Sequence, residues 1–214
     1  MIMSRRKTKP CSNLSTSIKI IVLAEGQTEK NYLKELKNKL LDSSFRLDIE
    51  DMHNGNYASF LSKLAELRGT ETPILIVVDL DRAADDKVEL SYLEELIDKL
   101  VKTNKQNNIF LTYRKFETFL SAHFDPFCNN LKDRLGFRNS DEIKSRPDIL
   151  TKIEQHGGDF ENTKKHFNNS NLFCYKKDFS ATLIDKNNIR TRQSSFINFI
   201  DYCNKIKESH LKSH

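Results

Sequence analysis

The feature that most constrains the fold is an alternation of apolar and amphipathic segments between residues 18 and 113. Four apolar runs have the length of strands, and they lie at residues 18–23, 45–52, 74–78 and 109–113. Three segments with apolar residues at helical spacing lie between them, at residues 28–41, 57–67 and 91–103. Strands that alternate with helices favour parallel pairing through right-handed crossovers. We therefore predict an α/β fold with a parallel four-stranded sheet flanked by helices.

Acidic residues directly follow two of these strands. Glu25 and Glu29 lie in the sequence Glu-Gly-Gln-Thr-Glu after the first strand, and Asp79 and Asp81 follow the third. Sites in α/β sheets form at the carboxyl ends of strands, so we expect the four carboxylates to converge. A bound Mg²⁺ would remove their mutual repulsion and keep positions open for phosphate oxygens. The pattern predicts a divalent-cation site.

The residues around the first cluster fit a phosphate beside such a cation. Gly26 is expected to allow a sharp turn and the close approach of a phosphate. A helix with Thr28 as its N-cap would direct its positive end to the same place. The competing interpretation is structural, because Glu25 can be a solvated loop acid and Glu29 can stabilise the helix dipole.

Basic residues are concentrated at the two ends of the chain. Residues 1–17 contain four basic and no acidic side chains, residues 18–160 contain 21 and 25, and residues 161–214 contain ten and five. An acidic region with basic flanks is typical of a metal-dependent enzyme that acts on a polyanion. We expect the first segment to be a flexible arm that binds nucleic acid through Arg5, Arg6, Lys7 and Lys9. The alternative is a tail without function.

The composition is that of a soluble globular protein. No apolar run approaches the roughly 20 residues of a membrane-spanning helix, and the N-terminus lacks the apolar stretch of a secretory signal. We expect a cytoplasmic protein without a membrane partner. The four cysteines lie far apart without a Cys-x-x-Cys pair, which predicts reduced thiols.

We divide the chain into an arm at 1–17, an α/β catalytic domain at 18–125 and a basic, mainly helical extension at 126–214 that packs on it. In the extension we predict helices at 143–156 and 195–207 and a short strand at 172–175. Lys176 and Lys177 follow this strand, and a lysine there could neutralise charge on a phosphoryl group. A solvated strand end is the alternative.

Three motifs carry a family resemblance. The strand that ends in Glu-Gly-x-Thr-Glu and the later Val-Val-Asp-Leu-Asp resemble the Toprim domain of topoisomerases, bacterial primases and overcoming-lysogenization-defect nucleases. Within that superfamily the chain is most similar to RloB-like proteins, which add an Asn-Pro-x-Phe-Glu-x-Trp-x-x-x-His-Phe element. Phe116, Glu117, His123 and Phe124 match this element. Arg114-Lys115 replaces Asn-Pro and Phe119 replaces Trp, as in a divergent member.

The resemblance implies a Toprim-like Rossmannoid fold and a role for each acid. Glu25 would act as general acid/base or metal ligand, Asp79 and Asp81 as metal ligands, and Glu29 as a further catalytic and metal-binding acid. Glu117 would complete the acidic cluster. From the residues alone, Glu117 would form an exposed ion pair with Arg114. His123, which lies on an apolar helix face, is expected to be a hydrogen-bonded core histidine.

We expect a Mg²⁺- or Mn²⁺-dependent nuclease that cuts DNA or RNA phosphodiesters. The resemblance also implies an effector of bacterial anti-phage defence with a separate ABC-type ATPase partner, since the chain has no G-x-x-x-x-G-K-[ST] motif of its own. Two alternatives stay open: a non-catalytic nucleic-acid-binding module, and a regulatory subunit of an ATPase-containing defence complex. Homo-oligomer formation is also left open.

Overall fold

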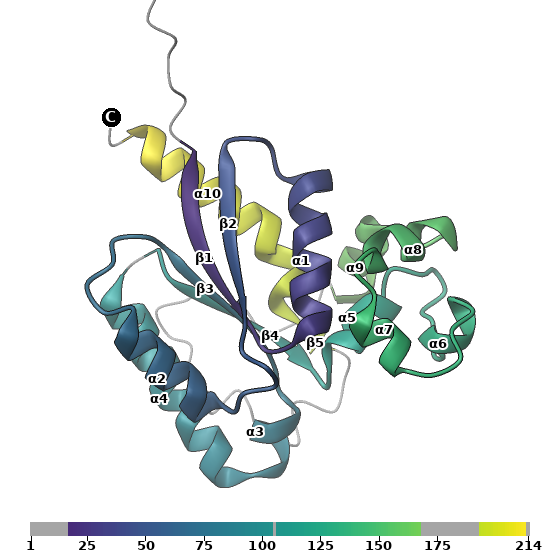
Figure 1. Ribbon diagram of the computed structural model, residues 1–214, viewed down its shortest axis with the longest axis horizontal. Coiled ribbons are helices and arrows are strands. Elements are labelled where there is room, and N and C mark those ends of the chain that lie inside the picture. Colours follow the sequence, from purple (N-terminus) through teal and green to yellow (C-terminus); the bar gives the residue numbers. More distant parts are fainter. Residues whose placement is uncertain (1–16, 105, 168–192, 213–214) are drawn as a thin grey trace, which may run out of the picture.

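A computed structural model describes residues 17–104, 106–167 and 193–212 and contains one sheet of five strands (Figure 1). The strands are β1 (Ile18–Ala24), β2 (Phe45–Asp51), β3 (Ile74–Asp79), β4 (Asn108–Tyr113) and β5 (Gln193–Ser194). Their order across the sheet is β2-β1-β3-β4-β5, and the first four are parallel. The predicted α/β class with a parallel sheet is confirmed.

The expected strand number was wrong, because β5 adds an antiparallel edge strand beside β4. It has only two residues, so no apolar pattern marks it in the sequence. Side-chain hydrogen bonds strengthen the short pairing. The Thr112 and Ser194 hydroxyls lie 2.8 Å apart, and the Leu111 N–H donates to Ser195 Oγ at 2.8 Å.

The helices that follow the first strands are longer than most of those nearer the C-terminus. They are α1 (Gln27–Leu40), α2 (Tyr57–Glu66), α3 (Asp81–Asp85), α4 (Lys87–Thr103), α5 (Phe116–Ser121), α6 (Leu131–Arg134), α7 (Asp141–Ser145), α8 (Ile149–Gln155), α9 (Phe160–Phe167) and α10 (Phe199–Lys212). A 3₁₀ helix, η2 (Ser195–Asn198), leads into α10.

Several helix boundaries differ from the sequence prediction for local reasons. Helix α1 is capped at Gly26, so Thr28 already lies inside it. Helix α4 begins four residues early, because the Asp86 carboxylate accepts a hydrogen bond from the Val88 N–H at 2.7 Å. The helix expected at 143–156 is split into α7 and α8, since Pro147 disfavours helical backbone at Arg146.

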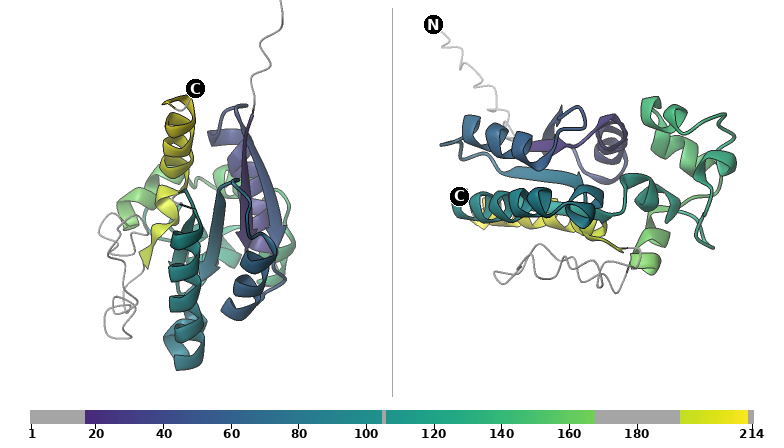
Figure 2. Two further views of the ribbon diagram at one scale, coloured as in Figure 1. Left: turned by 90° about the vertical axis from the view of Figure 1, so that its left-hand side faces the viewer. Right: turned by 90° about the horizontal axis from the view of Figure 1, so that it is seen from below.

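The helices cover the two faces of the sheet unequally. Helices α2, α3 and α4 bury aliphatic side chains of β3 and β4 on one face. On the other face, α1, α10 and the helices of residues 116–167 share a core rich in aromatic rings. Figure 2 shows α10 running along the sheet, and Figure 1 shows α5 to α9 gathered beyond α1.

Contacts from α1 hold this outlying group of helices in place. The Glu35 carboxylate accepts hydrogen bonds from the Leu150 N–H at 2.6 Å and from the Thr151 N–H at 3.2 Å, at the start of α8. The Asn31 side-chain amide donates to the Lys144 carbonyl at 3.4 Å. Among the described residues, no helix is both long enough and apolar enough to cross a membrane.

Candidate active site

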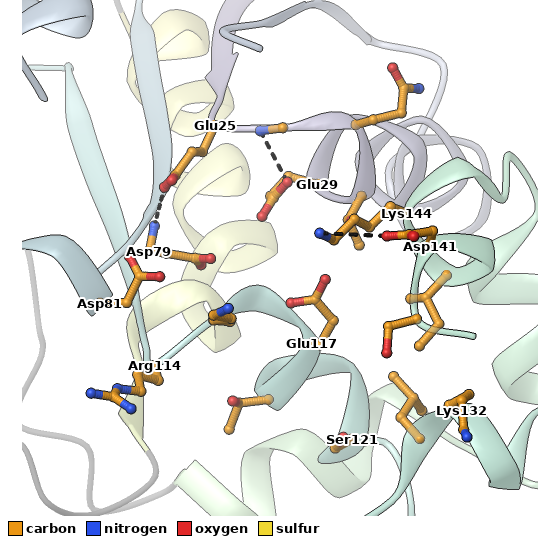
Figure 3. A pocket seen from close by; sticks show the side chains of 18 of the residues that line it. Glu25, Glu29, Asp79, Asp81, Arg114, Glu117, Ser121, Lys132, Asp141 and Lys144 are labelled. Atoms are coloured by element: carbon orange, nitrogen blue, oxygen red, sulfur yellow. Dashed lines mark hydrogen bonds and ion pairs between the residues drawn. The ribbon is translucent and has the colours of Figure 1, made fainter. Parts of the chain in front are cut away.

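Glu25 and Asp79 lie side by side at the carboxyl end of the sheet. Glu25 follows the last residue of β1, and Asp79 is the last residue of β3, its neighbour. From β1 the chain passes to β2 on one side and then to β3 on the other, which makes this edge the topological switch point where α/β sheets form sites. The Asp79 N–H donates to Glu25 Oε2 at 2.7 Å (Figure 3).

Glu29 reaches the same place from the first turn of α1. Its carboxylate accepts a hydrogen bond from the Gly26 N–H at 3.1 Å and so satisfies the start of the helix. The conformational freedom expected of Gly26 is not used, because its φ of −147° is available to any residue. Instead, a Cβ there would come within 3.0 Å of Asn54 Oδ1 and 3.3 Å of Glu29 Oε2.

Asp81 and Glu117 complete the group. Asp81 begins α3, and Glu117 lies in the first turn of α5. The alternative of an ion pair between Glu117 and Arg114 was wrong, since the Arg114 guanidinium contacts the Asp85 carboxylate at 3.1 Å. We call Glu25, Glu29, Asp79, Asp81 and Glu117 the acidic cluster. All five line one pocket of about 1090 Å³.

Burial and mutual repulsion raise the pKa values within the cluster. Loss of hydration raises the pKa of Glu25 to about 7 and that of Glu29 to about 8, with further contributions from neighbouring carboxylates. The pKa of Asp79 also lies well above its ordinary value, first because of burial and then because of the nearby glutamates. The charge of Glu117 raises all three, so it acts as part of the cluster.

One oxygen of the cluster has no partner. Asp79 Oδ1 is buried and accepts no hydrogen bond within the described residues, although most buried polar atoms have one. The atoms around Asp79 that could coordinate a metal ion are carboxylate oxygens, and these suit a hard cation such as Mg²⁺. No three His, Cys, Asp or Glu side chains of the described ranges are already spaced as a complete metal site. The donor chemistry fits a cation, whereas the spacing would have to tighten around it.

Three residues that sequence reasoning missed support the cluster. Arg82 lies with its guanidinium 3.7 Å from the Glu25 carboxylate and donates to the Asn54 carbonyl at 2.7 Å. The Tyr57 hydroxyl donates to the Asp79 carbonyl at 2.6 Å. Arg82 directly follows Asp81, so a cation beside the second acidic motif was the available signal. The sequence contained no such signal for Tyr57 or Asn54, because their roles depend on how the loop after β2 folds.

The far side of the pocket is formed by residues between 127 and 145, which we call the second wall. Its polar members are mainly amides, hydroxyls and lysines, namely Asn129, Asn130, Lys132, Ser140, Asp141, Lys144 and Ser145. Figure 3 shows Lys132 and Lys144 across the pocket from Asp79. Sequence reasoning assigned no function to this segment.

His123 lies in the core, apart from the pocket. Its Nε2 is 2.8 Å from the Tyr32 hydroxyl, and its Nδ1 is 3.2 Å from the Phe119 carbonyl. Complete burial lowers the pKa of His123 to about 4, so the ring is neutral at neutral pH. The arm residues Arg5, Arg6, Lys7 and Lys9, the strand expected at 172–175, and Lys176 and Lys177 lie outside the described residues.

Comparison with known proteins identifies a family. Residues 20–211 match the RloB-like protein family, which covers most of the chain, so the chain belongs to that family. No curated protein and no solved structure matches this chain.

Proposed function

We propose that this RloB-like protein is a Mg²⁺- or Mn²⁺-dependent nuclease whose acidic cluster forms a Toprim-like active site. The observation that carries the proposal is the unpartnered, buried Asp79 Oδ1 among five converging carboxylates. Such an arrangement is unfavourable without a counter-charge, and a divalent cation supplies one. The position at the switch point of a parallel sheet supports the same interpretation.

In this proposal the cation would be held by Glu25, Glu29, Asp79 and Asp81, and Glu117 would complete the cluster. When bound, Mg²⁺ would polarise a phosphoryl oxygen and offset the charge that develops during phosphodiester cleavage. The protein fixes the ligands beforehand. The Asp79 N–H orients the Glu25 carboxylate, and the Tyr57 hydroxyl holds the Asp79 main chain.

Glu29 would serve two purposes at once. Its hydrogen bond to the Gly26 N–H stabilises the start of α1, and its charge adds to the demand for a cation. Arg82 would partly balance Glu25 and limit repulsion before metal binds. The functional and structural interpretations of Glu29 are therefore compatible.

The wider role that we propose is that of an effector in bacterial anti-phage defence, with a separate ABC-type ATPase partner. This part rests on the resemblance to RloB-like proteins and on the missing phosphate-loop motif. Expression beside a candidate ATPase, with phage challenge and pull-down, tests it. An effector that protects cells without any ATPase gene would contradict the partner proposal.

Cleavage of labelled plasmid DNA and of total RNA tests the enzymatic proposal. Wild type is incubated with Mg²⁺, Mn²⁺ or EDTA beside Glu25→Gln, and Asp98→Asn, on the exposed face of α4, is the matched control. We expect metal-dependent cleavage that Glu25→Gln loses and Asp98→Asn keeps. Metal-dependent nucleic-acid binding without cleavage, unaffected by Glu25→Gln, would instead favour the non-catalytic alternative.

A further inference from the structure

The two sides of the pocket have opposite chemistry. The acidic cluster occupies the sheet edge, whereas the second wall presents amides, hydroxyls and lysines. Asp141, the acid of the second wall, is already paired with Lys144 at 4.0 Å. A ligand that spans the pocket therefore meets a cation-binding surface on one side and hydrogen-bond donors on the other.

Three lysines that line the pocket can receive phosphates. Lys115 forms no ion pair with any described residue, and it precedes α5 at the pocket. Lys132, at a half-buried position, contacts Asp133 at 3.2 Å, and Lys144, at an exposed position, contacts Asp141 at 4.0 Å. Solvent-accessible ion pairs of this kind are weak, so a phosphate can compete for either lysine. Together the three cations can follow a polyanionic backbone across the pocket.

Two aromatic side chains also line the pocket and are partly exposed. Tyr113 ends β4, and Phe127 begins the second wall. The Phe127 ring is held edge-on to His166, with ring centroids 5.6 Å apart. Proteins that bind single-stranded nucleic acid combine a positive groove with aromatic rings on which unpaired bases stack. Paired bases inside a duplex cannot stack in this way.

The burial of the acids favours a thin, flexible substrate. Glu25 and Glu29 are only 9% and 5% exposed, so a phosphate must pass between the two sides of the pocket to reach a cation at this site. A pocket of about 1090 Å³ is close to the upper limit for small-molecule sites and can hold a few nucleotides. In a duplex the bases stay stacked and paired, so a duplex could not bring one strand alone, with an unpaired base, into such a space.

We propose that the pocket binds single-stranded nucleic acid, with phosphates at Lys115, Lys132 and Lys144 and an unpaired base on Phe127 or Tyr113. The inference rests on the proposed function and defines its substrate class. DNA and RNA strands share the phosphates and base faces that this site recognises. Duplex nucleic acid is the alternative that the test must exclude.

Binding is measured apart from cleavage, so that the two proposals fail separately. The full chain carrying Asp79→Asn and Asp81→Asn serves as a cleavage-deficient background with less repulsion in the pocket. Fluorescence anisotropy gives the Kd for a labelled 12-nucleotide DNA strand, the RNA strand of the same sequence and the matching DNA duplex, at several salt concentrations. We expect at least one single strand to bind about tenfold more tightly than the duplex.

Substitutions in the pocket then locate the binding. Phe127→Leu and Tyr113→Leu remove a stacking surface, and loss of one stacked base should weaken single-strand binding about tenfold. Lys132→Gln and Lys144→Gln should each lower the slope of log K against log salt concentration by about 0.7. Tyr92→Leu and Lys99→Gln, both exposed on α4, are the matched controls and should leave single-strand binding unchanged. Melting curves identify any variant that fails to fold.

The outcomes are distinct. Equal affinity for strand and duplex, or single-strand binding that the folded pocket variants leave unchanged, would overturn the inference. Pocket-dependent binding of single strands by a protein that cleaves nothing would overturn the nuclease proposal and leave this one standing. Cleavage of duplex DNA with single strands left intact would support the nuclease proposal and overturn the single-strand inference.

Discussion

Helix α1 contributes to two buried polar clusters that lie three residues apart and differ in how they are satisfied. Glu29 points into the acidic cluster, where carboxylates surround one another and Asp79 Oδ1 has no hydrogen-bond partner among the described residues. Tyr32 points into the aromatic core, where its hydroxyl pairs with a neutral His123. The second cluster is satisfied by its own hydrogen bonds, whereas in the first Arg82 offsets only part of the carboxylate charge. This difference separates a structural polar group from a candidate functional one.

The largest expected effect comes from removing the charge of the unpartnered acid. Asp79→Asn should lower metal-dependent cleavage at least 10³-fold, because the amide is a poorer ligand for a hard cation. Glu29→Gln should lower it less, since the amide oxygen can still accept from the Gly26 N–H. Initial rates at saturating Mg²⁺ measure both. Equal losses of activity in the two variants would contradict the expectation that the Asp79 carboxylate matters more for cleavage than the Glu29 carboxylate.

The pH dependence of stability should reveal the satisfied cluster. The unfolded histidine takes up a proton below about pH 6.5, whereas folded His123 does so only near pH 4. The folded state is therefore favoured at neutral pH, and this contribution is lost as the pH falls from 6.5 to 4. The loss is about 3 kcal/mol over the full window.

Denaturant unfolding of wild type and of His123→Asn at pH 7 and pH 4.5 measures this effect. The stability difference between the two proteins should shrink at the lower pH, and contributions from the carboxylates cancel because both proteins contain them. Ser62→Ala, an exposed substitution on α2 that changes no ionisable group, is the control and should show no such trend. A difference that stays constant with pH would show that folded His123 takes up its proton as readily as the unfolded histidine does, so that burial does not lower its pKa.

Removal of one partner should disturb the satisfied cluster by a smaller amount. Tyr32→Phe leaves His123 Nε2 without its hydrogen bond, which costs about 1–3 kcal/mol of unfolding free energy. Metal-dependent activity should be retained, because Tyr32 is not one of the described residues that line the pocket. Chemical denaturation gives the free energy, with Tyr92→Phe on the exposed face of α4 as the control. A loss of activity at unchanged stability would contradict this assignment.

The smallest effect concerns the stability of the acidic cluster without metal. Glu25 and Glu29 hold protons in the folded state up to about pH 7 and about pH 8, above the ordinary 4.5, so stability should fall as the pH rises through this window. Asp79→Asn relieves part of the repulsion and should raise the melting temperature at pH 8 by ~2–4 °C, for about 1 kcal/mol.

Thermal melting in EDTA and in Mg²⁺ measures this change. In Mg²⁺ the sign should reverse, because wild type gains a ligand that the variant binds poorly. A melting temperature that falls strongly in EDTA would show that the Asp79 carboxylate stabilises the fold by itself.

Local sequence patterns predicted one side of the pocket and missed the other. Glu25 and Asp79 follow mainly apolar strands, and parallel pairing brings the ends of such strands together, so their convergence was predictable. The second wall comes from short helices joined by loops, whose positions depend on distant contacts such as the one between Glu35 and α8. Composition and periodicity carry no information about contacts of that kind.

The same limit explains the errors in the fold. The strand β5 is too short to show a period, and it forms because Ser194 and Ser195 bond to β4. The break before α8 was visible in the sequence, since Pro147 restricts the residue before it. The role of Glu117 was also ambiguous, because either Arg114 or the cluster could have attracted its charge. In the structure Arg114 pairs with Asp85, and the charge of Glu117 acts on the pKa of Asp79.

The return of the C-terminal segment to β4 has a consequence for how the chain is made. Phe196 and Phe199 pack against Phe110 on β4, with ring centroids 6.2 Å and 5.1 Å apart. During synthesis the ribosome releases β4 more than eighty residues before Phe196 and Phe199. Until those residues emerge, the free edge of β4 and its aromatic face lack the C-terminal segment that covers them. Exposed strand edges attract other chains. Strand β5, which pairs with the edge of β4, and the rings of Phe196 and Phe199 thus end that exposure for each nascent molecule, and translation speed past residue 113 sets how long it lasts.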